Sequence, residues 1–215
     1  MAIKKYDLIL CDCPFEYDNK QQNDPTRGGI TYPTMNMEEL YNLPIHKIAK
    51  ENSILVYWCT FPKICDLYYN KYDPLSVIRA WGFRPVTALF VWIKSNKNTV
   101  LDLSDELDTE QGMYSGLGRY TNSNAEFAIV ARKGKMLERK AKNVKQLIVA
   151  PIGKHSAKPV EQYTRLENLF GNDLDKVELF GRKENPPPKH QNWDVVGLDW
   201  EPSIDIRDWL KLYDV

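Results

Sequence analysis

The sequence of 215 residues has no net charge, only four cysteines and no long hydrophobic run. Its 29 basic residues balance 29 acidic ones, so the overall charge neither directs the chain to nucleic acid nor excludes it. No segment approaches the ~20 apolar residues that a membrane-spanning helix needs, and the first residues carry charge rather than a signal-peptide pattern. We therefore expect no membrane segment and a cytoplasmic location.

The cysteines also lack the spacing of a zinc site. Cys11 and Cys13 are close in sequence, but Cys59 and Cys65 are too far apart to complete the paired pattern of zinc ligands. Cys11 and Cys59 lie in apolar patterns, where a buried thiol acts as a small hydrophobic side chain. The sequence therefore predicts no structural metal.

The composition is that of a folded globular protein. Hydrophobic residues make up 43% of the chain and charged residues 27%, which argues against disorder. The length fits one substantial hydrophobic core. We expect residues 1–215 to form a single domain.

Apolar and amphipathic segments alternate along the chain, and this order predicts an α/β domain with a mostly parallel sheet. The predicted strands cover residues 3–11, 53–60, 84–94, 125–131, 146–150, 176–180 and 193–197. One helix is predicted over residues 36–51 and another from Pro62 to Gly82, interrupted near Asp73. A third begins at Pro159 and carries an apolar stripe of Val160, Tyr163, Leu166 and Leu169.

The tetrapeptide Asp12-Cys13-Pro14-Phe15 directly follows the first predicted strand, where α/β sheets bind their ligands. A nucleobase amino group is a poor nucleophile because its lone pair is delocalised into the ring. The Asp12 carboxylate and a backbone carbonyl are two acceptors that would hold the amine hydrogens and free this lone pair. Phe15 would stack on the base while the turn fixes the angle of attack.

Two further segments are not explained by the strand and helix patterns. One lacks periodicity and the other carries an excess of positive charge. Residues 95–124 lack periodicity, which is typical of functional or mobile loops. Residues 132–145 combine seven basic residues with Glu138 as the acidic one: Arg132, Lys133, Lys135, Arg139, Lys140, Lys142 and Lys145. This stretch fits a phosphate-binding ribbon and an ordinary solvated ribbon equally well.

Taken in order, these motifs resemble the adenine N6-methyltransferases, a family that includes the catalytic subunit of the messenger-RNA adenosine methylating complex and many small bacterial and phage DNA methyltransferases. The family's catalytic tetrapeptide is D-P-P-W, in whose place Asp12-Cys13-Pro14-Phe15 stands. Further matching blocks follow in the family's order at residues 32–35, 55–58, 90–94, 116–120 with Glu126, 155–159, and 178–182 with Trp193 and Gly197. The resemblance spans about residues 6–200.

The resemblance implies a Rossmann-like S-adenosylmethionine-dependent methyltransferase fold, with helices on both faces of the sheet and a permuted motif order. In that order the catalytic turn, with Asp12, Cys13, Pro14 and Phe15 as the catalytic residues, precedes the methyl-donor site. S-adenosylmethionine would be the donor.

The resemblance also assigns the donor-binding residues. Lys158 stands at the family's position for the methionine carboxylate; without the resemblance it would be taken for a solvent-facing lysine. Arg182 and Asn185 match positions that hold the ribose hydroxyls, and Asp199 falls near the position that binds the adenosine. Asp12 belongs to this donor-binding set as well.

Two residues depart from the family's tetrapeptide. Cys13 keeps the backbone carbonyl but loses the rigid φ of a proline, and Phe15 keeps a smaller stacking face. We expect an active DNA adenine N6-methyltransferase in a bacterium or a phage-infected cell. The alternatives are an RNA substrate, cytosine amino-methylation, or a catalytically silent nucleic-acid-binding subunit of a methyltransferase complex. The sequence allows both a homo-oligomer and a hetero-oligomer.

Overall fold

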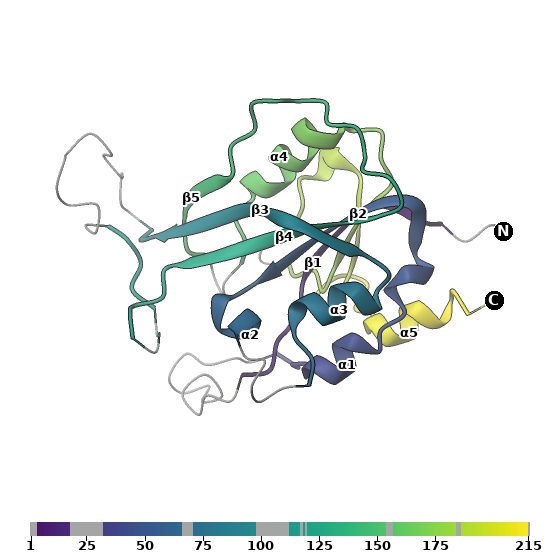
Figure 1. Ribbon diagram of the computed structural model, residues 1–215, viewed down its shortest axis with the longest axis horizontal. Coiled ribbons are helices and arrows are strands. Elements are labelled where there is room, and N and C mark those ends of the chain that lie inside the picture. Colours follow the sequence, from purple (N-terminus) through teal and green to yellow (C-terminus); the bar gives the residue numbers. More distant parts are fainter. Residues whose placement is uncertain are drawn as a thin grey trace.

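A computed structural model describes residues 4–17, 32–65, 71–97, 112–116, 118, 120–153, 157–183 and 186–214 (Figure 1). Within these residues a seven-stranded sheet runs through the molecule in the order β5-β3-β4-β2-β1-β6-β7. The strands are β1 (Tyr6–Asp12), β2 (Ala49–Cys59), β3 (Arg84–Ser95), β4 (Ala125–Lys133), β5 (Leu147–Pro151), β6 (Lys176–Leu179) and β7 (Trp193–Val196).

Strand direction brings the ends of several strands to one edge of the sheet. Only β4, among the described strands, runs against its neighbours, so the sheet is mostly parallel, as the sequence predicted. β1, β2, β3 and β6 therefore end at the same edge, and β4 begins there. Asp12 pairs with Trp58 and Trp58 with Ala128, two residues after Glu126. This carboxyl edge is where an α/β sheet binds its ligands.

Helices cover both faces of the sheet, which confirms the Rossmann-like α/β architecture (Figure 1). The cores on the two faces are separated by the alternation of side chains along each strand; in β1, Ile9 and Leu10 point to opposite faces. One face packs against α1 (Met37–Tyr41), α3 (Pro74–Ala80) and α5 (Ile206–Lys211), and the other against α4 (Glu161–Phe170). Among the described residues, no helix has the length and apolar character needed to cross a membrane.

The helix predicted over residues 36–51 is wrong in its length. Asn36 and Glu39 form the predicted capping box, but α1 ends at Tyr41, a 3-10 turn follows over Ile45–Lys47, and β2 begins at Ala49. Pro44 explains the stop, because proline lacks an N–H and disfavours helical backbone at the residue before it.

The other predicted elements occur, with shifted ends. In place of the helix predicted from Pro62 to Gly82, the structure has α2 (Phe61–Cys65), which begins one residue earlier, and α3, with residues 66–70 outside the described part of the chain. α4 buries three residues of the predicted apolar stripe, but Val160 precedes the helix and is 51% exposed. The sequence did not predict α5 or the 3-10 turn over Lys189–Gln191.

The outer edge of β5 is covered by an arginine from α4. Nη1 of Arg165 donates to the carbonyl of Lys145 and, at 2.7 Å, to that of Leu147. Glu161, one turn earlier on α4, accepts from Nε and Nη2 of the same guanidinium at 2.9 and 2.7 Å. Carbonyl groups at a sheet edge are open to pairing with another strand, and here the arginine occupies two of them.

We predict that Asp73→Ala lowers the free energy of unfolding by about 1 kcal/mol. Asp73 caps α3: Oδ1 accepts the N–H of Ser76 at 2.5 Å, and Ser76 Oγ accepts the N–H of Asp73 at 2.8 Å. Alanine leaves the Ser76 amide without this acceptor. Urea unfolding followed by circular dichroism measures the loss. Asp208→Ala, at an exposed position on α5, is the matched control, and an equal loss in both variants would contradict the capping role.

Candidate active site

The tetrapeptide 12–15 forms a turn at the carboxyl edge of the sheet, directly after β1. The N–H of Phe15 donates to the carbonyl of Cys13 at 2.9 Å, and the N–H of Met35 donates to the carbonyl of Pro14 at 2.8 Å. Phe15 and Met35 also form a β-bridge. The turn is thus held by its own backbone and by the segment that leads into α1, while the Asp12 side chain remains 25% exposed.

Lys158 lies against Asp12, so the structure brings together two residues that the sequence assigned to one site. Nζ of Lys158 is 2.7 Å from Oδ2 of Asp12 and 3.1 Å from Oε2 of Glu126. The lysine is 8% exposed and therefore not the solvent-facing residue that its sequence alone would suggest. A buried ammonium needs such partners, because an isolated buried charge is very costly.

The ion pairs continue from Glu126 into β3. Nζ of Lys94 lies 2.5 Å from Oε1 of Glu126, so each oxygen of the Glu126 carboxylate faces a different lysine. We call Asp12, Lys158, Glu126 and Lys94 the charge cluster. Glu126 and Lys94 both lie in blocks that match the family, but the resemblance assigned neither residue a role. The sequence feature that could have identified them is a charged residue within a predicted strand that is otherwise mainly apolar.

The environment keeps the two central members of the cluster ionised. Burial alone would raise the pKa of Glu126, but Lys158 and Lys94 hold it below its ordinary value. Burial alone would lower the pKa of Lys158, but Asp12 and Glu126 raise it well above its ordinary value. At neutral pH the structure therefore places a carboxylate and an ammonium next to Asp12.

The two residues that depart from the family's tetrapeptide both pack into the core. Sγ of Cys13 lies 3.3 Å from Sγ of Cys11, so the thiol fills space beneath the turn. The ring of Phe15 is 5% exposed and lies 6.1 Å from the Tyr57 ring and 6.3 Å from the Tyr17 ring, measured between centroids. Because so little of Phe15 is exposed, its role as a stacking face for a base stays a prediction.

Tyr17 is a half-buried aromatic residue near the charge cluster that was not among the predicted site residues. Its hydroxyl lies 3.2 Å from Oγ1 of Thr60, and Nζ of Lys63 lies 4.8 Å from its ring centre. Burial raises the pKa of Tyr17, and the charge of Glu126 adds to this effect. The sequence does show aromatic residues at alternate positions here, with Phe15 as the last residue of the turn and Tyr17 two residues later.

Arg182 and Asp199, both predicted to bind the donor, are neighbours in the structure. They form a parallel β-bridge just beyond β6 and β7, and the N–H of Lys183 donates to the carbonyl of Asp199 at 3.0 Å. The guanidinium of Arg182 lies 3.8 Å from the centre of the Tyr32 ring. Asn185, the third residue assigned to this part of the site, lies outside the described residues.

Glu178 lies on β6, opposite Leu10 of β1, and accepts a hydrogen bond from the Tyr163 hydroxyl at 2.9 Å. Burial raises the pKa of Glu178 to about 8, the Tyr163 hydrogen bond opposes this rise, and the charge of Asp12 adds to it. Glu178 is therefore mainly protonated at neutral pH, unlike Glu126.

The MT-A70 family model matches residues 6–199 of the sequence. The chain belongs to the MT-A70 family. It is 30% identical over 213 residues to the type II methyltransferase M.MunI of a Mycoplasma species, covering 91% of this chain and 78% of that protein. It is 24% identical over 217 residues to the N(6)-adenosine-methyltransferase MT-A70-like protein of Drosophila melanogaster, covering 99% of this chain but 30% of the fly protein. Fold and family are those of a methyltransferase.

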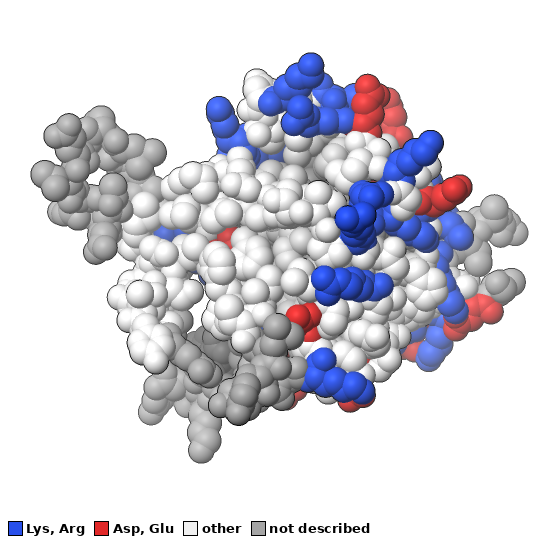
Figure 2. Space-filling model, in the orientation of Figure 1, with Lys and Arg blue, Asp and Glu red and all other residues white. Residues whose placement is uncertain are grey.

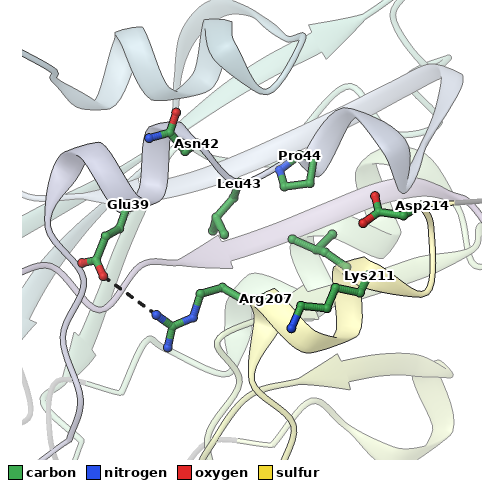
Figure 3. A pocket seen from close by; sticks show the side chains of 8 residues that line it. Glu39, Asn42, Leu43, Pro44, Arg207, Lys211 and Asp214 are labelled. Carbon is green, nitrogen blue, oxygen red and sulfur yellow. Dashed lines mark ion pairs between the residues drawn. The ribbon is translucent and has the colours of Figure 1, made fainter.

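Away from the turn 12–15 and the charge cluster, the MT-A70 chain has a hollow of about 410 Å³ between α1 and α5 (Figure 3). Its charged groups are paired with one another or with close neighbours: Arg207 with Asp205 and Glu39, Lys211 with Asp208, and Asp214 with Lys47. It shares no residue with the charge cluster. The hollow is therefore separate from the predicted catalytic and donor-binding residues.

The basic stretch 132–145 of the MT-A70 chain begins at the opposite edge of the sheet from Asp12, because Lys133 pairs with Ser53 near the start of β2. Figure 2 shows Lys and Arg side chains gathered over the loop between β4 and β5. Part of the excess charge is used within the protein: Lys133 donates to the carbonyls of His46 and Ala49, and Lys140 pairs with Glu138. A role in phosphate binding stays a prediction, and this position is remote from the turn 12–15.

We predict that Glu178→Gln removes a pH dependence of stability. Because the folded-state pKa lies near 8 and the unfolded value near 4.5, only the folded state keeps this proton between these two pH values. Wild-type stability should therefore fall as pH rises through this window, with a contribution from Glu178 of up to about 1.4 kcal/mol per pH unit. Urea unfolding at several pH values measures the slope. Equal slopes in wild type and variant would contradict the raised pKa.

Proposed function

We propose that the chain is a DNA adenine N6-methyltransferase that uses S-adenosylmethionine as its methyl donor. The observation that carries this proposal is the pairing of Asp12, at the end of β1, with the buried Lys158 in a chain of the MT-A70 family. We further propose that residues 1–215 form one methyltransferase domain and act in the cytoplasm of a bacterium or a phage-infected cell.

The chemistry of the side chains fits the donor. Its amino-acid end carries a carboxylate and an ammonium, and Lys158 and Asp12 offer the opposite charge to each at one place. Arg182 and Asp199, adjacent through their β-bridge, would hold the nucleoside part together with Asn185. When bound, the donor supplies an electrophilic methyl group on a sulfonium.

The turn 12–15 would activate the amino group of the target base. Oδ2 of Asp12 is held by Lys158, which leaves Oδ1 to accept one amine hydrogen. The carbonyls of Cys13 and Pro14 each accept one backbone N–H, and a carbonyl oxygen has a second lone pair for the other amine hydrogen. With both hydrogens held, the nitrogen lone pair is directed away from the ring system and the attack is oriented.

Asp12 would also take the proton that the amine loses on methylation. Its carboxylate is the charged acceptor closest to the turn, and its partial exposure gives the proton a route to solvent. Lys158 holds the Asp12 carboxylate in position, and Glu126 keeps Lys158 in place. Cys13, Pro14 and Phe15 act through the backbone shape of the turn and its packing on the core.

The proposed substrate follows from the two relatives. The Mycoplasma protein, most of whose length is covered, is named a type II methyltransferase, which supports DNA as the substrate. The fly protein is named an N(6)-adenosine-methyltransferase, which supports the adenine amine as the acceptor. In duplex DNA the target base would have to rotate out of the stack to reach Asp12.

We predict that Asp12→Asn abolishes methyl transfer but only weakens donor binding, because Lys158 remains and the amide oxygen can still accept a hydrogen bond from the donor's ammonium. Asparagine keeps the size of the side chain but removes the charged acceptor for the amine hydrogen and proton, so the loss should fall on the reaction. The measurement is nucleoside mass spectrometry of mixed DNA and RNA after incubation with donor, which also separates N6-methyladenine from cytosine products. Donor binding is measured by calorimetric titration.

Asp173→Asn, at an exposed position before β6, is the matched control and should behave as wild type. Undiminished adenine methylation by Asp12→Asn would refute the role of Asp12. Wild-type protein that binds donor but modifies no nucleic acid, and that stimulates an active partner subunit, would establish the catalytically silent alternative instead.

We predict that Lys158→Met weakens donor binding by roughly 1.5–3 kcal/mol, the range for a hydrogen bond to a charged group. Methionine keeps much of the buried volume and removes the ammonium. The exposed Lys142→Met serves as control for the loss of one positive charge. Calorimetric titration gives both affinities, and an unchanged dissociation constant for Lys158→Met would remove Lys158 from the donor site.

A further inference from the structure

Lys94, one residue before the end of β3, is the member of the charge cluster at the opposite end from Asp12. Its side chain is 10% exposed, with Nζ 2.5 Å from Oε1 of Glu126 and 5.0 Å from the centre of the Trp92 ring. Glu126 faces Lys94 with Oε1 and Lys158 with Oε2. Lys94 is therefore connected to Asp12 through two intervening side chains on two other segments of the chain.

Stability does not account for this arrangement. Removing charged groups from water is expensive, and replacing a buried ion pair by apolar residues of similar size is often neutral or stabilising. The Lys94–Glu126 pair is almost fully buried, in strands that otherwise carry apolar side chains towards the same core. What the pair does provide is a fixed direction for the second oxygen of Glu126, which points at Lys158.

We propose that Lys94 is a positioning residue for methyl transfer: by holding Glu126, it fixes the Lys158 ammonium against Asp12. The inference rests on the proposed function and adds to it a residue of β3 that touches neither donor nor base. Without Lys94, the Glu126 carboxylate is free to rotate towards Lys158 with both oxygens, and Lys158 is drawn away from Asp12. The carboxylate that accepts the amine hydrogen then loses its fixed orientation.

The loss of Lys94 also has a pH signature. Lys94 and Lys158 together hold the pKa of Glu126 below its ordinary value against the effect of burial, so removing one lysine raises it. The other titratable groups that interact with Glu126 are Tyr17 and Cys59, whose pKa values burial raises, so both stay neutral near pH 7. In a variant without Lys94, Glu126 therefore becomes protonated at a higher pH and releases Lys158.

The test compares wild type with Lys94→Met, Lys94→Arg and Lys97→Met. Lys97 lies two residues beyond β3 and is exposed, so its replacement is the matched control. The measurement is kcat with labelled S-adenosylmethionine and DNA of random sequence, between about pH 5.5 and about pH 9, so that the acid limb of the profile is visible. Thermal unfolding shows whether each variant is folded.

We expect kcat of Lys94→Met to fall about 10- to 100-fold at neutral pH, because displaced catalytic groups lose orientation. Its acid limb should move to higher pH, Lys94→Arg should restore most activity with the wild-type limb, and Lys97→Met should match wild type. Wild-type kcat and an unmoved limb in Lys94→Met would overturn the inference and leave the proposed function intact. A wild-type protein without product would overturn both.

Glu126→Gln keeps the inference testable if Lys94→Met does not fold. The amide has the shape of the carboxylate but no charge, so it should lower kcat over the whole pH range, without the shifted acid limb. A Glu126→Gln protein that is folded and has wild-type kcat would overturn the inference, because Lys94 has no other route to Asp12 in the proposal.

Discussion

The pairing of Lys158 with Asp12 and Glu126 is the interaction on which the rest of the site depends. A lysine so deeply buried needs carboxylates around it, and the fold supplies them from strands that are far apart in sequence. Asp12 reaches the edge because β1 ends there. Glu126 reaches it because β4 runs antiparallel to its neighbours and begins there. Among the described strands, only β4 is antiparallel to its neighbours. Its first residues, including Glu126, therefore lie at the edge where the parallel strands end.

The turn 12–15 shows how a motif can change in sequence and keep its shape. The family's first proline would restrict φ, and Cys13 lacks that restriction. In its place the Cys13 thiol packs on Cys11, and the Pro14 carbonyl is fixed by Met35. Phe15 anchors the end of the turn in the core. Packing against the rest of the protein therefore holds the backbone of this turn, where in the family's tetrapeptide the proline ring restricts φ.

The sequence predicted the fold well because periodicity reports which face of an element is buried. The apolar strand segments and the stripe along α4 follow directly from that rule. The predicted length of the first helix was wrong because the capping box marks only where a helix begins. Pro44 was the sequence feature that indicated its early end. Asp12 and Lys158 were predicted as one site from the family resemblance. The charge cluster could not be, since the pairing of Lys94 with Glu126 requires the register of β3 on β4.

Arg165 has a consequence for how this protein can meet other copies of itself. The Arg165 guanidinium occupies the carbonyls of Lys145 and Leu147, so a strand of another molecule can pair with these groups of the β5 edge only after the arginine has left them. Growth of a continuous intermolecular sheet from this side, the usual route to edge-to-edge aggregation, is therefore opposed by a residue of the helix packed behind it.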